Sequence, residues 1–306
     1  MATITNNSFA KALWPGLNKI FNTTYDMYPT QYTEFTSTVK SDKNREEYAG
    51  FSGLGLAPIK AEGAATQFDT MEQGFVRTVN NTAYSLGYII TREARKDGKY
   101  MEIATARTKA LARSIRTTKE TVAANMLNRA FNNSYTGLDG VEMCSTAHLT
   151  KSGRTYQNEL TTAADLSEAS LEQALIDIGD FTDERGLQIQ CQATKLLVPN
   201  ELQFEACRIL ESKLRVDTSN NDINAMNKKG SIPDYAVNNF LTDPDAWFII
   251  TDVTSKMGEG LIFQDRESDE FYSDNEFTTQ NAQFAVYSRF AFSWIDPRGI
   301  YGSAGA

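Results

Sequence analysis

The sequence predicts an α+β fold in which long extended segments surround a compact core. Residues 101–131 contain no glycine or proline and are rich in Ala, Arg, Lys and Glu, which is typical of one long helix. The segments that read as strands do not alternate with helices in βαβ order, which favours α+β over α/β. Residues 50–82 read as two extended runs, around 67–71 and 74–81, that carry polar and apolar side chains on both faces.

The composition is that of an ordinary globular protein. The chain has 306 residues, enough for one large domain or two modest ones, with 41% hydrophobic and 23% charged residues. Its net charge of −9 argues against a general nucleic-acid binder but leaves room for a local basic face. We expect no secretory signal and no membrane span, because no basic segment followed by an apolar one opens the chain and no apolar stretch approaches 18 residues.

The cysteines indicate free thiols in a reducing compartment. Cys144, Cys191 and Cys207 lack the paired spacing of a zinc site, and three cysteines do not form a disulfide framework. The sequence therefore predicts no metal and no cofactor.

The first ninety residues predict an arm followed by extended structure. Residues 1–22 read as a short amphipathic arm that Pro15 and Gly16 interrupt. Alternation within residues 23–49 suggests a strand around residues 32–38, and residues 84–91 (YSLGYIIT) return to an apolar, core-like pattern. The apolar positions of the arm are Phe9, Leu13, Leu17, Ile20 and Phe21.

The long helix would act as a spine. At about 1.5 Å per residue a helix over 101–131 spans roughly 45 Å, which is long for a domain of this size. One narrow apolar stripe is predicted to face the core. It consists of Ile103, Ala106, Ala110, Ile115, Val122, Met126 and Ala130.

The second half of the chain predicts shorter elements after a loop-rich stretch at 132–165. A capping box at Ser167 predicts the start of a helix that ends near Gly186. Strands are expected at 188–199, 246–252, 261–264 and 282–295, a helix at 201–214 and a polar loop at 217–231.

Three patterns resemble chemical motifs but favour a structural interpretation. Cys144 and His148 are four residues apart, yet glycines flank them, so a loop or surface histidine is expected rather than a nucleophilic pair. The Gly-x-Gly at residues 53–55 is followed by Ala57 and Pro58 and not by a helix, which favours a flexible joint over a phosphate cradle. A solvated acidic face is expected from Asp177, Asp180, Asp183 and Glu184, whose spacing matches no divalent-ion loop.

Residues 92–120 carry nine basic and four acidic side chains, a net charge of +5 within an acidic chain. This surplus suits either the phosphates of nucleic acid or ion pairs with the acidic remainder of other copies. We favour inter-subunit pairing, because no aromatic residue lies within 101–120 to stack on bases.

The excursion at residues 50–82 cannot bury itself. An isolated two-stranded hairpin is marginal in water, and an unpaired edge with exposed apolar side chains is a liability. Another copy of the chain is the economical cover for this segment and for the N-terminal arm, with each contact stabilised by about 25 cal/mol per Å² of apolar area.

The ordered series of segments resembles the major capsid proteins of tailed bacteriophages, the Hong Kong 97-type fold, and in particular Mu-like head subunits. The resemblance covers nearly the whole chain, and no single motif is diagnostic. The similar segments include LWPGLNKIF, GFSGLGLAP, YSLGYIITREA, ETVAANMLNRAF, DGVEMCSTAH, SEASLEQALIDIGDFTDERG, KLLVPNELQF, DPDAWFI and DPRGIYGS.

The resemblance implies four parts. Residues 1–40 would form the N-terminal arm and residues 41–90 the E-loop, which lies over an adjacent subunit. Residues 91–186 and 276–306 would form the peripheral domain around the spine helix. Residues 187–275 would form the axial domain, which points to the five- and six-fold centres.

The resemblance also implies which residues meet other copies. The E-loop contacts would be Phe68, Phe75, Val76, Arg77 and Val79, and the arm contacts Phe9, Leu13, Trp14 and Leu17. The spine helix would present Arg107, Arg113 and Arg116, and the capsomer axis would meet Asp222, Asn224, Lys228 and Lys229.

The function implied is structural, with no catalytic residues. Copies would form hexamers and pentamers of an icosahedral head that encloses double-stranded DNA without sequence-specific binding. The shell would assemble in the host cytoplasm and persist in the virion, with a portal, a decoration or cement protein and a separate scaffolding protein as partners. We expect a separate scaffold and no propeptide, because the chain keeps Met1 and has no long coiled N-terminal extension. Lys60 is a conceivable donor for covalent cross-linking, but no partners for it are evident.

Two alternatives stay open. One is an encapsulin-like compartment of the same fold that holds protein cargo. The other is a cytoplasmic hydrolase that uses Cys144 and His148.

Overall fold

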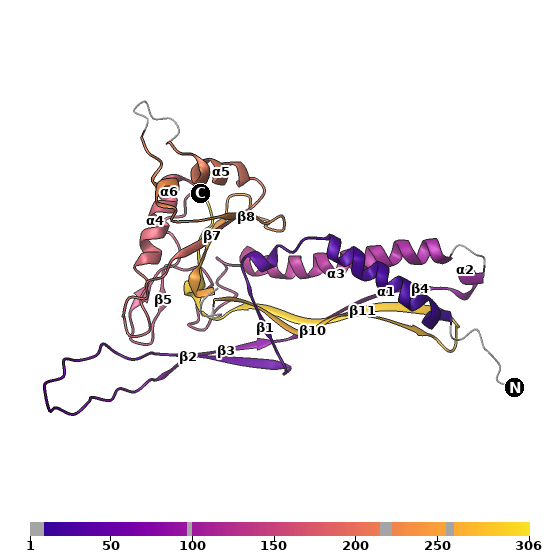
Figure 1. Ribbon diagram of the computed structural model, residues 1–306, viewed down its shortest axis with the longest axis horizontal. Coiled ribbons are helices and arrows are strands. Elements are labelled where there is room, and N and C mark those ends of the chain that lie inside the picture. The colour runs from indigo at the N-terminus through magenta and orange to yellow at the C-terminus, as the bar shows by residue number, and fades with distance from the viewer. Residues whose placement is uncertain (1–8, 97–99, 215–221, 255–259) are drawn as a thin grey trace.

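The computed structural model describes residues 9–96, 100–214, 222–254 and 260–306. Three parts are visible in Figure 1: a long limb, an upright part above one end of it, and a hairpin that projects beyond their junction. The helices are α1 (Phe9–Met27), α2 (Arg92–Lys96), α3 (Tyr100–Asn128), α4 (Glu168–Gly179), α5 (Gln203–Glu211) and α6 (Ala225–Lys229), with short 3₁₀ turns η2 (Tyr32–Glu34) and η4 (Pro297–Gly299). Among the described residues, no helix has the length and apolar character to cross a membrane.

The strands form two four-stranded sheets and two hairpins. The limb sheet has the order β1-β10-β11-β4 and the upright sheet the order β12-β9-β7-β8, while β2 pairs with β3 and β5 with β6. The strands are β1 (Ser37–Lys40), β2 (Arg45–Phe51), β3 (Gln73–Asn80), β4 (Thr82–Ile90), β5 (His148–Leu149), β6 (Thr155–Tyr156), β7 (Ala193–Val198), β8 (Tyr235–Val237), β9 (Trp247–Thr251), β10 (Leu261–Asn275), β11 (Ala282–Trp294) and β12 (Ile300–Ser303).

The limb is built on the long antiparallel pair of β10 and β11. The register runs from Leu261 opposite Trp294 to Asn275 opposite Ala282, with bulges around Glu267. On the far side of β11, β4 approaches closely at Gly87, where a Cβ atom would lie 2.7 Å from the carbonyl oxygen of Phe284. Only glycine allows this approach without a shift of the backbone.

The helices α1 and α3 cover one face of the limb sheet. The face of α3 that is buried carries Leu111 and Ile115, and it continues to Ala104 at one end and Leu127 at the other. A polar group also lies within this face: the Thr108 hydroxyl is 2.7 Å from the Tyr88 hydroxyl and donates to the carbonyl of Ala104. The helix is therefore fixed to the sheet by apolar packing and by a satisfied buried hydrogen bond.

Helix α1 packs onto α3 and β10 of its own chain, which corrects the predicted arm. Leu17 and Phe21 are each only 1% exposed, and the ring of Phe21 stacks on that of Phe271 at 5.1 Å. The helix continues through Pro15 and Gly16, although proline inside a helix costs about 3 kcal/mol. Burial of two large side chains is of similar size and offsets that cost.

Charged groups add to this attachment. The Arg116 guanidinium lies 3.9 Å from the centroid of the Tyr25 ring and donates to the Tyr25 backbone carbonyl. The Lys119 ammonium forms a buried ion pair with Asp269 at 2.8 Å. Glu120 accepts the backbone N–H groups of Gln31 and Tyr32, which holds the turn that follows α1.

The upright part has its own core around the fully buried strand β9. Trp247 and Ile249 pack with Tyr301 of β12 and with Leu171 of α4. The chain passes from the limb sheet into the upright sheet through η4, because β12 pairs with β9. The two parts are joined by the chain itself and by a shared core, in which Phe248 and Ile250 of β9 pack with limb residues such as Phe263.

Asn158 fixes the junction between the parts. Its amide nitrogen donates to the carbonyls of Met143, Pro297 and Ile300 at 2.8–3.2 Å. Its amide oxygen accepts the backbone N–H of Ser145 at 2.8 Å. One buried side chain thus satisfies four backbone groups from separate segments.

Several predicted elements are confirmed. The long helix is present, α4 begins at the Ser167 capping box, and β7, α5, β9 and β11 lie within their predicted ranges. Strand β10 is far longer than the predicted 261–264, and α4 ends at Gly179, seven residues before the predicted Gly186.

Other predictions are wrong about the type of element or about which of its faces is buried. The alternation at 32–38 forms η2 and then β1, and Leu86 and Ile89 of the core-like segment 84–91 are about half exposed on a strand at the sheet edge. Of the predicted stripe on α3, Ile103, Ala106 and Ala110 face away from the core. Apolar residues occur on both sides of the first half of this helix, so the buried face is decided by the sheet that it meets.

We expect Phe21→Ala to lower the free energy of unfolding by about 3–5 kcal/mol, because it removes a fully buried ring from the contact between α1 and β10. Urea unfolding followed by circular dichroism measures the change. Lys19→Ala, on the exposed side of the same helix, is the control. A loss below about 1 kcal/mol for Phe21→Ala would contradict this account of α1.

Candidate assembly interface

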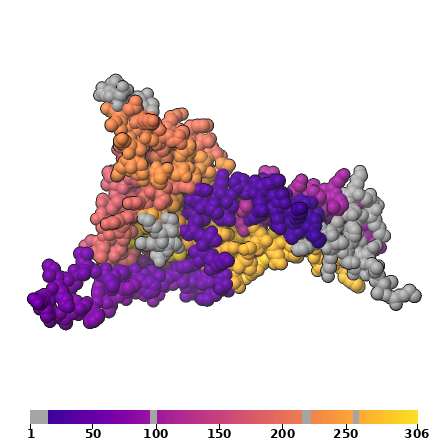
Figure 2. All heavy atoms as spheres, in the orientation of Figure 1, coloured from indigo at the N-terminus to yellow at the C-terminus, as the bar shows by residue number. Residues whose placement is uncertain are grey.

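The projecting part is a long hairpin, here called the E-loop hairpin, made of β2, β3 and the connecting residues 52–72. The pairing runs from Arg45 opposite Asn80 to Phe51 opposite Gln73. The second predicted run is therefore a strand, whereas the run at 67–71 is not, and the partner of β3 lies upstream at 45–51. Figure 2 shows the hairpin as a purple lobe at the lower left that extends away from the rest of the molecule.

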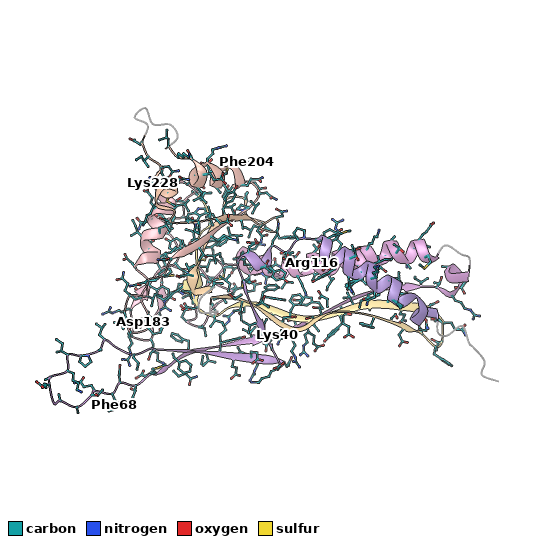
Figure 3. The ribbon with its side chains drawn as sticks, viewed as in Figure 1. Lys40, Phe68, Arg116, Asp183, Phe204 and Lys228 are labelled. Atoms are coloured by element: carbon teal, nitrogen blue, oxygen red, sulfur yellow. The ribbon has the colours of Figure 1, made fainter. Side chains whose placement is uncertain are left out.

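Large apolar side chains at the tip of this hairpin lie in solvent. Ile59 is fully exposed, and Phe68 and Leu56 are 96% and 82% exposed. Figure 3 places Phe68 on the projecting loop, away from both four-stranded sheets. Soluble proteins rarely leave such a concentration of apolar side chains uncovered, and patches of this kind mark sites of protein contact.

The tip is held in one direction by an ion pair to its own chain. Asp69 accepts from the backbone N–H of Gly55 at 2.8 Å and from the Arg185 guanidinium at 2.5 Å. Arg185 also donates to the carbonyl of Thr70 at 2.6 Å. The N–H of Gly55 and the Arg185 guanidinium lower the pKa of Asp69 to about 2, so this carboxylate stays charged at neutral pH. We call these contacts the Asp69–Arg185 latch.

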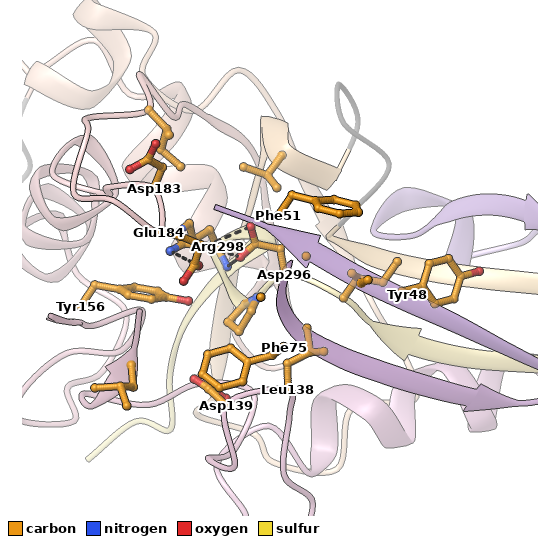
Figure 4. Close-up of a pocket in the computed structure, with 18 residues that line it drawn as sticks. Tyr48, Phe51, Phe75, Leu138, Asp139, Tyr156, Asp183, Glu184, Asp296 and Arg298 are labelled. Carbon is orange, nitrogen blue, oxygen red and sulfur yellow. Dashed lines mark hydrogen bonds and ion pairs between the residues drawn. The ribbon is translucent and has the colours of Figure 1, made fainter. Parts of the chain in front are cut away.

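A cavity of about 270 Å³ lies at the base of the hairpin (Figure 4). Phe51 and Phe75 of the hairpin form its apolar side. On the opposite side the Arg298 guanidinium, buried against the Tyr156 ring at 4.4 Å, pairs with Glu184 at 2.9 Å and Asp296 at 3.2 Å. The cavity thus has an apolar wall on one side and, on the other, an arginine held between two carboxylates.

Some of the predicted E-loop contact residues are exposed and could contact another copy, whereas others are buried in their own chain. Phe68 and Val76 are exposed and Phe75 is half-buried. Val79 is a correction: it is 4% exposed, because it lies where β3 joins the limb. Arg77 is half-buried and donates to the carbonyl of Thr136 in its own chain.

Leu17 is the one predicted arm contact whose side chain the structure describes, and it is buried within its own subunit. It is therefore not available to another copy. The side chains of Phe9, Leu13 and Trp14 lie outside the described residues.

The predicted basic face of the spine helix is only partly free. Arg113 is exposed on α3. Arg107 donates to the carbonyl of Ile89 at 2.7 Å, at the sheet edge. Arg116 is occupied by Tyr25 of α1, so it attaches the arm of its own chain and is not part of a free basic surface.

The predicted axis loop lies at the apex of the upright part, where Figure 3 places Lys228 and Phe204. Lys228, Lys229 and Asp222 are exposed. Asn224 is a correction, because it is buried and caps α6 by accepting the N–H of Met226 at 2.9 Å while it donates to the carbonyl of Ile209. The predicted loop at 217–231 thus includes a short helix, and residues 217–221 lie outside the described residues.

His148 is buried, which corrects the expected loop or surface position. Its Nδ1 lies 2.6 Å from Asp139 and its Nε2 lies 2.9 Å from the Asn158 amide oxygen. Burial raises the pKa of the Cys144 thiol well above its usual value, and the carboxylates of Glu159 and Glu142 add to the shift. The pair thus lacks an activated thiol.

Within the described part of the chain, no group of three or more His, Cys, Asp or Glu side chains is placed to hold a metal ion. Asp177 and Glu184 of the predicted acidic face instead make contacts within the chain. Asp177 accepts from the Tyr301 hydroxyl at 2.6 Å, and Glu184 pairs with Arg298.

The Asp69–Arg185 latch and the cavity at the base of the hairpin were not predicted from the sequence. Their residues come from segments more than a hundred positions apart. The only sequence signal was the run of glycines at 50–63, which indicated a joint but not the surface that it faces.

A family model described as phage capsid protein matches residues 76–303. No curated protein matches the sequence significantly. Solved structures match over most of the chain at low identity, so their likeness shows the fold alone.

Several of these structures have TM-scores of 0.50 or 0.51, and three serve as examples. A chain of the procapsid of bacteriophage JBD30 is 13% identical with a TM-score of 0.51, and the match covers 98% of this chain and 76% of that chain. The virus-like particle from Pyrococcus furiosus is 8% identical with a TM-score of 0.50, covering 94% and 97%. The holo-SrpI encapsulin complex from Synechococcus elongatus PCC 7942 is 9% identical with a TM-score of 0.51, covering 90% and 88%.

We expect Asp69→Asn to release the latch, because the amide lacks the charge that Arg185 binds. Limited proteolysis of the unassembled chain within residues 52–72 should become several-fold faster, with little change in thermal stability, since exposed ion pairs contribute at most about 1 kcal/mol. Glu62→Gln, which removes a charge from the same tip, is the control. Equal cleavage rates for Asp69→Asn and the wild type would contradict the latch.

Proposed function

The chain belongs to the phage capsid protein family and is a major capsid protein with the Hong Kong 97-type fold, and we propose that its copies form hexamers and pentamers that tile an icosahedral head around double-stranded DNA. The family match covers most of the chain. It also favours a phage head over the encapsulin-like compartment, although an encapsulin is among the structures with a similar fold.

The exposed tip of the E-loop hairpin is the observation that carries the proposal. Leu54, Leu56, Ile59, Phe68 and Met71 are all more than half exposed. Their burial against a neighbouring copy would contribute on the order of 10 kcal/mol per subunit before the cost of ordering. In a closed ring every subunit both covers a neighbour and is covered, so each hairpin in the ring finds a partner.

We propose the four parts of the sequence analysis with two boundaries adjusted to the sheets. Residues 1–40 form the arm and 41–90 the E-loop region. Strand β10 joins the peripheral domain, because it pairs with β1 and β11. Strand β12 joins the axial domain, because it pairs with β9.

The apex of the upright part is the proposed contact at the capsomer axis. Its exposed side chains mix charge and apolar character. Lys228 and Lys229 lie there with Phe204, which is 67% exposed, and Ile223, which is 65% exposed. A ring of such apices would bury the apolar groups against one another and keep the lysines at its rim.

We further propose the partners and location that the family implies. Assembly takes place in the host cytoplasm with a portal, a scaffolding protein and decoration proteins, and the shell becomes part of the virion. The net charge of −9 suits an inner surface that does not bind packaged DNA tightly. No catalysis is proposed, and the buried, protonated Cys144 thiol supports this view.

Deletion of residues 60–72 should leave folded monomers or capsomers and no shells, because it removes Phe68 and Met71 and shortens the projecting loop while β2 and β3 stay intact. Negative-stain microscopy and sedimentation measure the outcome. The control is the Lys60→Ala, Glu62→Ala variant, which changes the charges of the tip but keeps its apolar side chains. Shells of normal size from the deletion variant would contradict the proposed role of the tip.

A further inference from the structure

A second cavity lies where α3 ends. It has a volume of about 610 Å³ and is lined by residues of β3, β4, α3, β11 and the loop at 134–136. Two of the lining residues, Arg77 and Arg129, are cationic, and none is acidic. We call it the arginine pocket.

Both guanidinium groups are held by stacking on aromatic rings. The Arg77 guanidinium lies 4.3 Å from the Trp294 ring centroid and donates to the carbonyl of Thr136 at 2.6 Å. The Arg129 guanidinium lies 4.5 Å from the centroid of Tyr135. Stacking leaves the in-plane N–H groups of an arginine free for hydrogen bonds and limits the side-chain entropy lost on binding.

Neither arginine has a carboxylate partner among the described residues. Asp139 is the acidic group whose charge acts on Arg77, but it is committed to His148 at 2.6 Å. The pocket therefore carries positive charge that no carboxylate of the described residues pairs with directly.

We propose that the arginine pocket binds a carboxylate side chain of a second copy of this chain in the assembled shell. A planar carboxylate matches the forked donors of a guanidinium in a bidentate pair. Acidic residues exceed basic ones in the chain by 39 to 30, so each copy offers surplus carboxylates to its neighbours. The pocket also lies at the base of the hairpin that reaches toward a neighbour, and in this respect the inference rests on the proposed function.

A second copy fits the pocket better than DNA does. Arg77 is half-buried between β11 and the loop at 134–136, where a side chain can enter but a duplex cannot. The chain as a whole carries a net charge of −9, which repels phosphate backbones.

Arg129→Gln is the first test. Arg129 is exposed and its guanidinium stacks on the Tyr135 ring, so the variant is expected to fold as the wild type does. The protein concentration needed for half-maximal shell assembly should rise about tenfold, the effect of losing one charged pair. Assembly of the variant should also depend less on salt between about 0.05 and 0.5 M than that of the wild type.

Arg154→Gln is the matched control, because Arg154 is exposed, does not line the arginine pocket and is not among the predicted contacts with other copies. It should leave the assembly concentration unchanged. An unchanged concentration for Arg129→Gln, or an equal change for both variants, would overturn the proposal while leaving the proposed function intact. Failure of the wild type to form shells would contradict both.

Cross-linking in shells of the Arg129→Lys variant identifies the partner. A water-soluble carbodiimide joins the introduced amine to a carboxylate with loss of water, and the carbodiimide becomes the urea. In shells made from equal amounts of ¹⁴N and ¹⁵N chains, mass spectrometry should find peptides of mixed isotope joined at residue 129. Peptides of one isotope only, or no link at residue 129 while other lysines react, would overturn the proposal. Normal shells that lose packaged DNA in Arg129→Gln would assign the pocket to phosphate instead.

Discussion

The structure depends on one constraint: the apolar tip of the E-loop hairpin has nowhere in its own chain to go. Its connecting residues 52–72 extend beyond both cores, and Ile59 and Phe68 are almost completely exposed. In water these side chains favour association at about 25 cal/mol per Å² of apolar area covered. Because every copy carries the same tip, each copy needs a neighbour, and contacts that run head to tail around a ring satisfy all of them.

The rest of the molecule supplies a rigid base for that tip. Helices α1 and α3, the limb sheet and the upright sheet are joined by buried rings, by the Lys119–Asp269 ion pair and by the hydrogen bonds of Asn158. A buried ion pair contributes little net stability but is costly to break on one side, so it favours a single arrangement of α3 and β10. The Asp69–Arg185 latch then orients the hairpin relative to this base. The free subunit therefore presents its tip in a defined direction, which lowers the entropy lost on assembly.

Local patterns carried most of the fold prediction. The spine helix follows from a long stretch without glycine or proline, and α4 follows from the Ser167 capping box, since both signals act within a few residues. The resemblance to capsid proteins predicted the fold correctly at the level of the whole chain. Long-range packing was not predictable in the same way. Leu17 was predicted to contact another copy, but it is buried in its own chain. The surface that buries it is formed by α3 and by strands near the C-terminus, which the local sequence around Leu17 does not reveal.

The sequence predicted the kind of surface that forms the candidate interface, but only some of its residues. The exposed tip with Phe68 was expected, but Val79 and Asn224 proved to be buried, and Arg116 is bound to Tyr25. The latch and the arginine pocket each combine segments that lie far apart in sequence. The presence of Arg185 or Arg129 in the sequence does not predict which residues lie next to it in the fold. A close-packed surface is a property of the tertiary fold, so such sites emerge only when the elements are placed together.

The central claim is that sister copies complete this fold by covering the hairpin tip. Electron cryomicroscopy of assembled shells at side-chain resolution tests it most directly. The account predicts that Ile59 and Phe68 lie buried against the limb of an adjacent copy, with the hairpin still extended from its own base. Shells in which these side chains remain in solvent, or in which residues 52–72 fold back onto their own subunit, would contradict it.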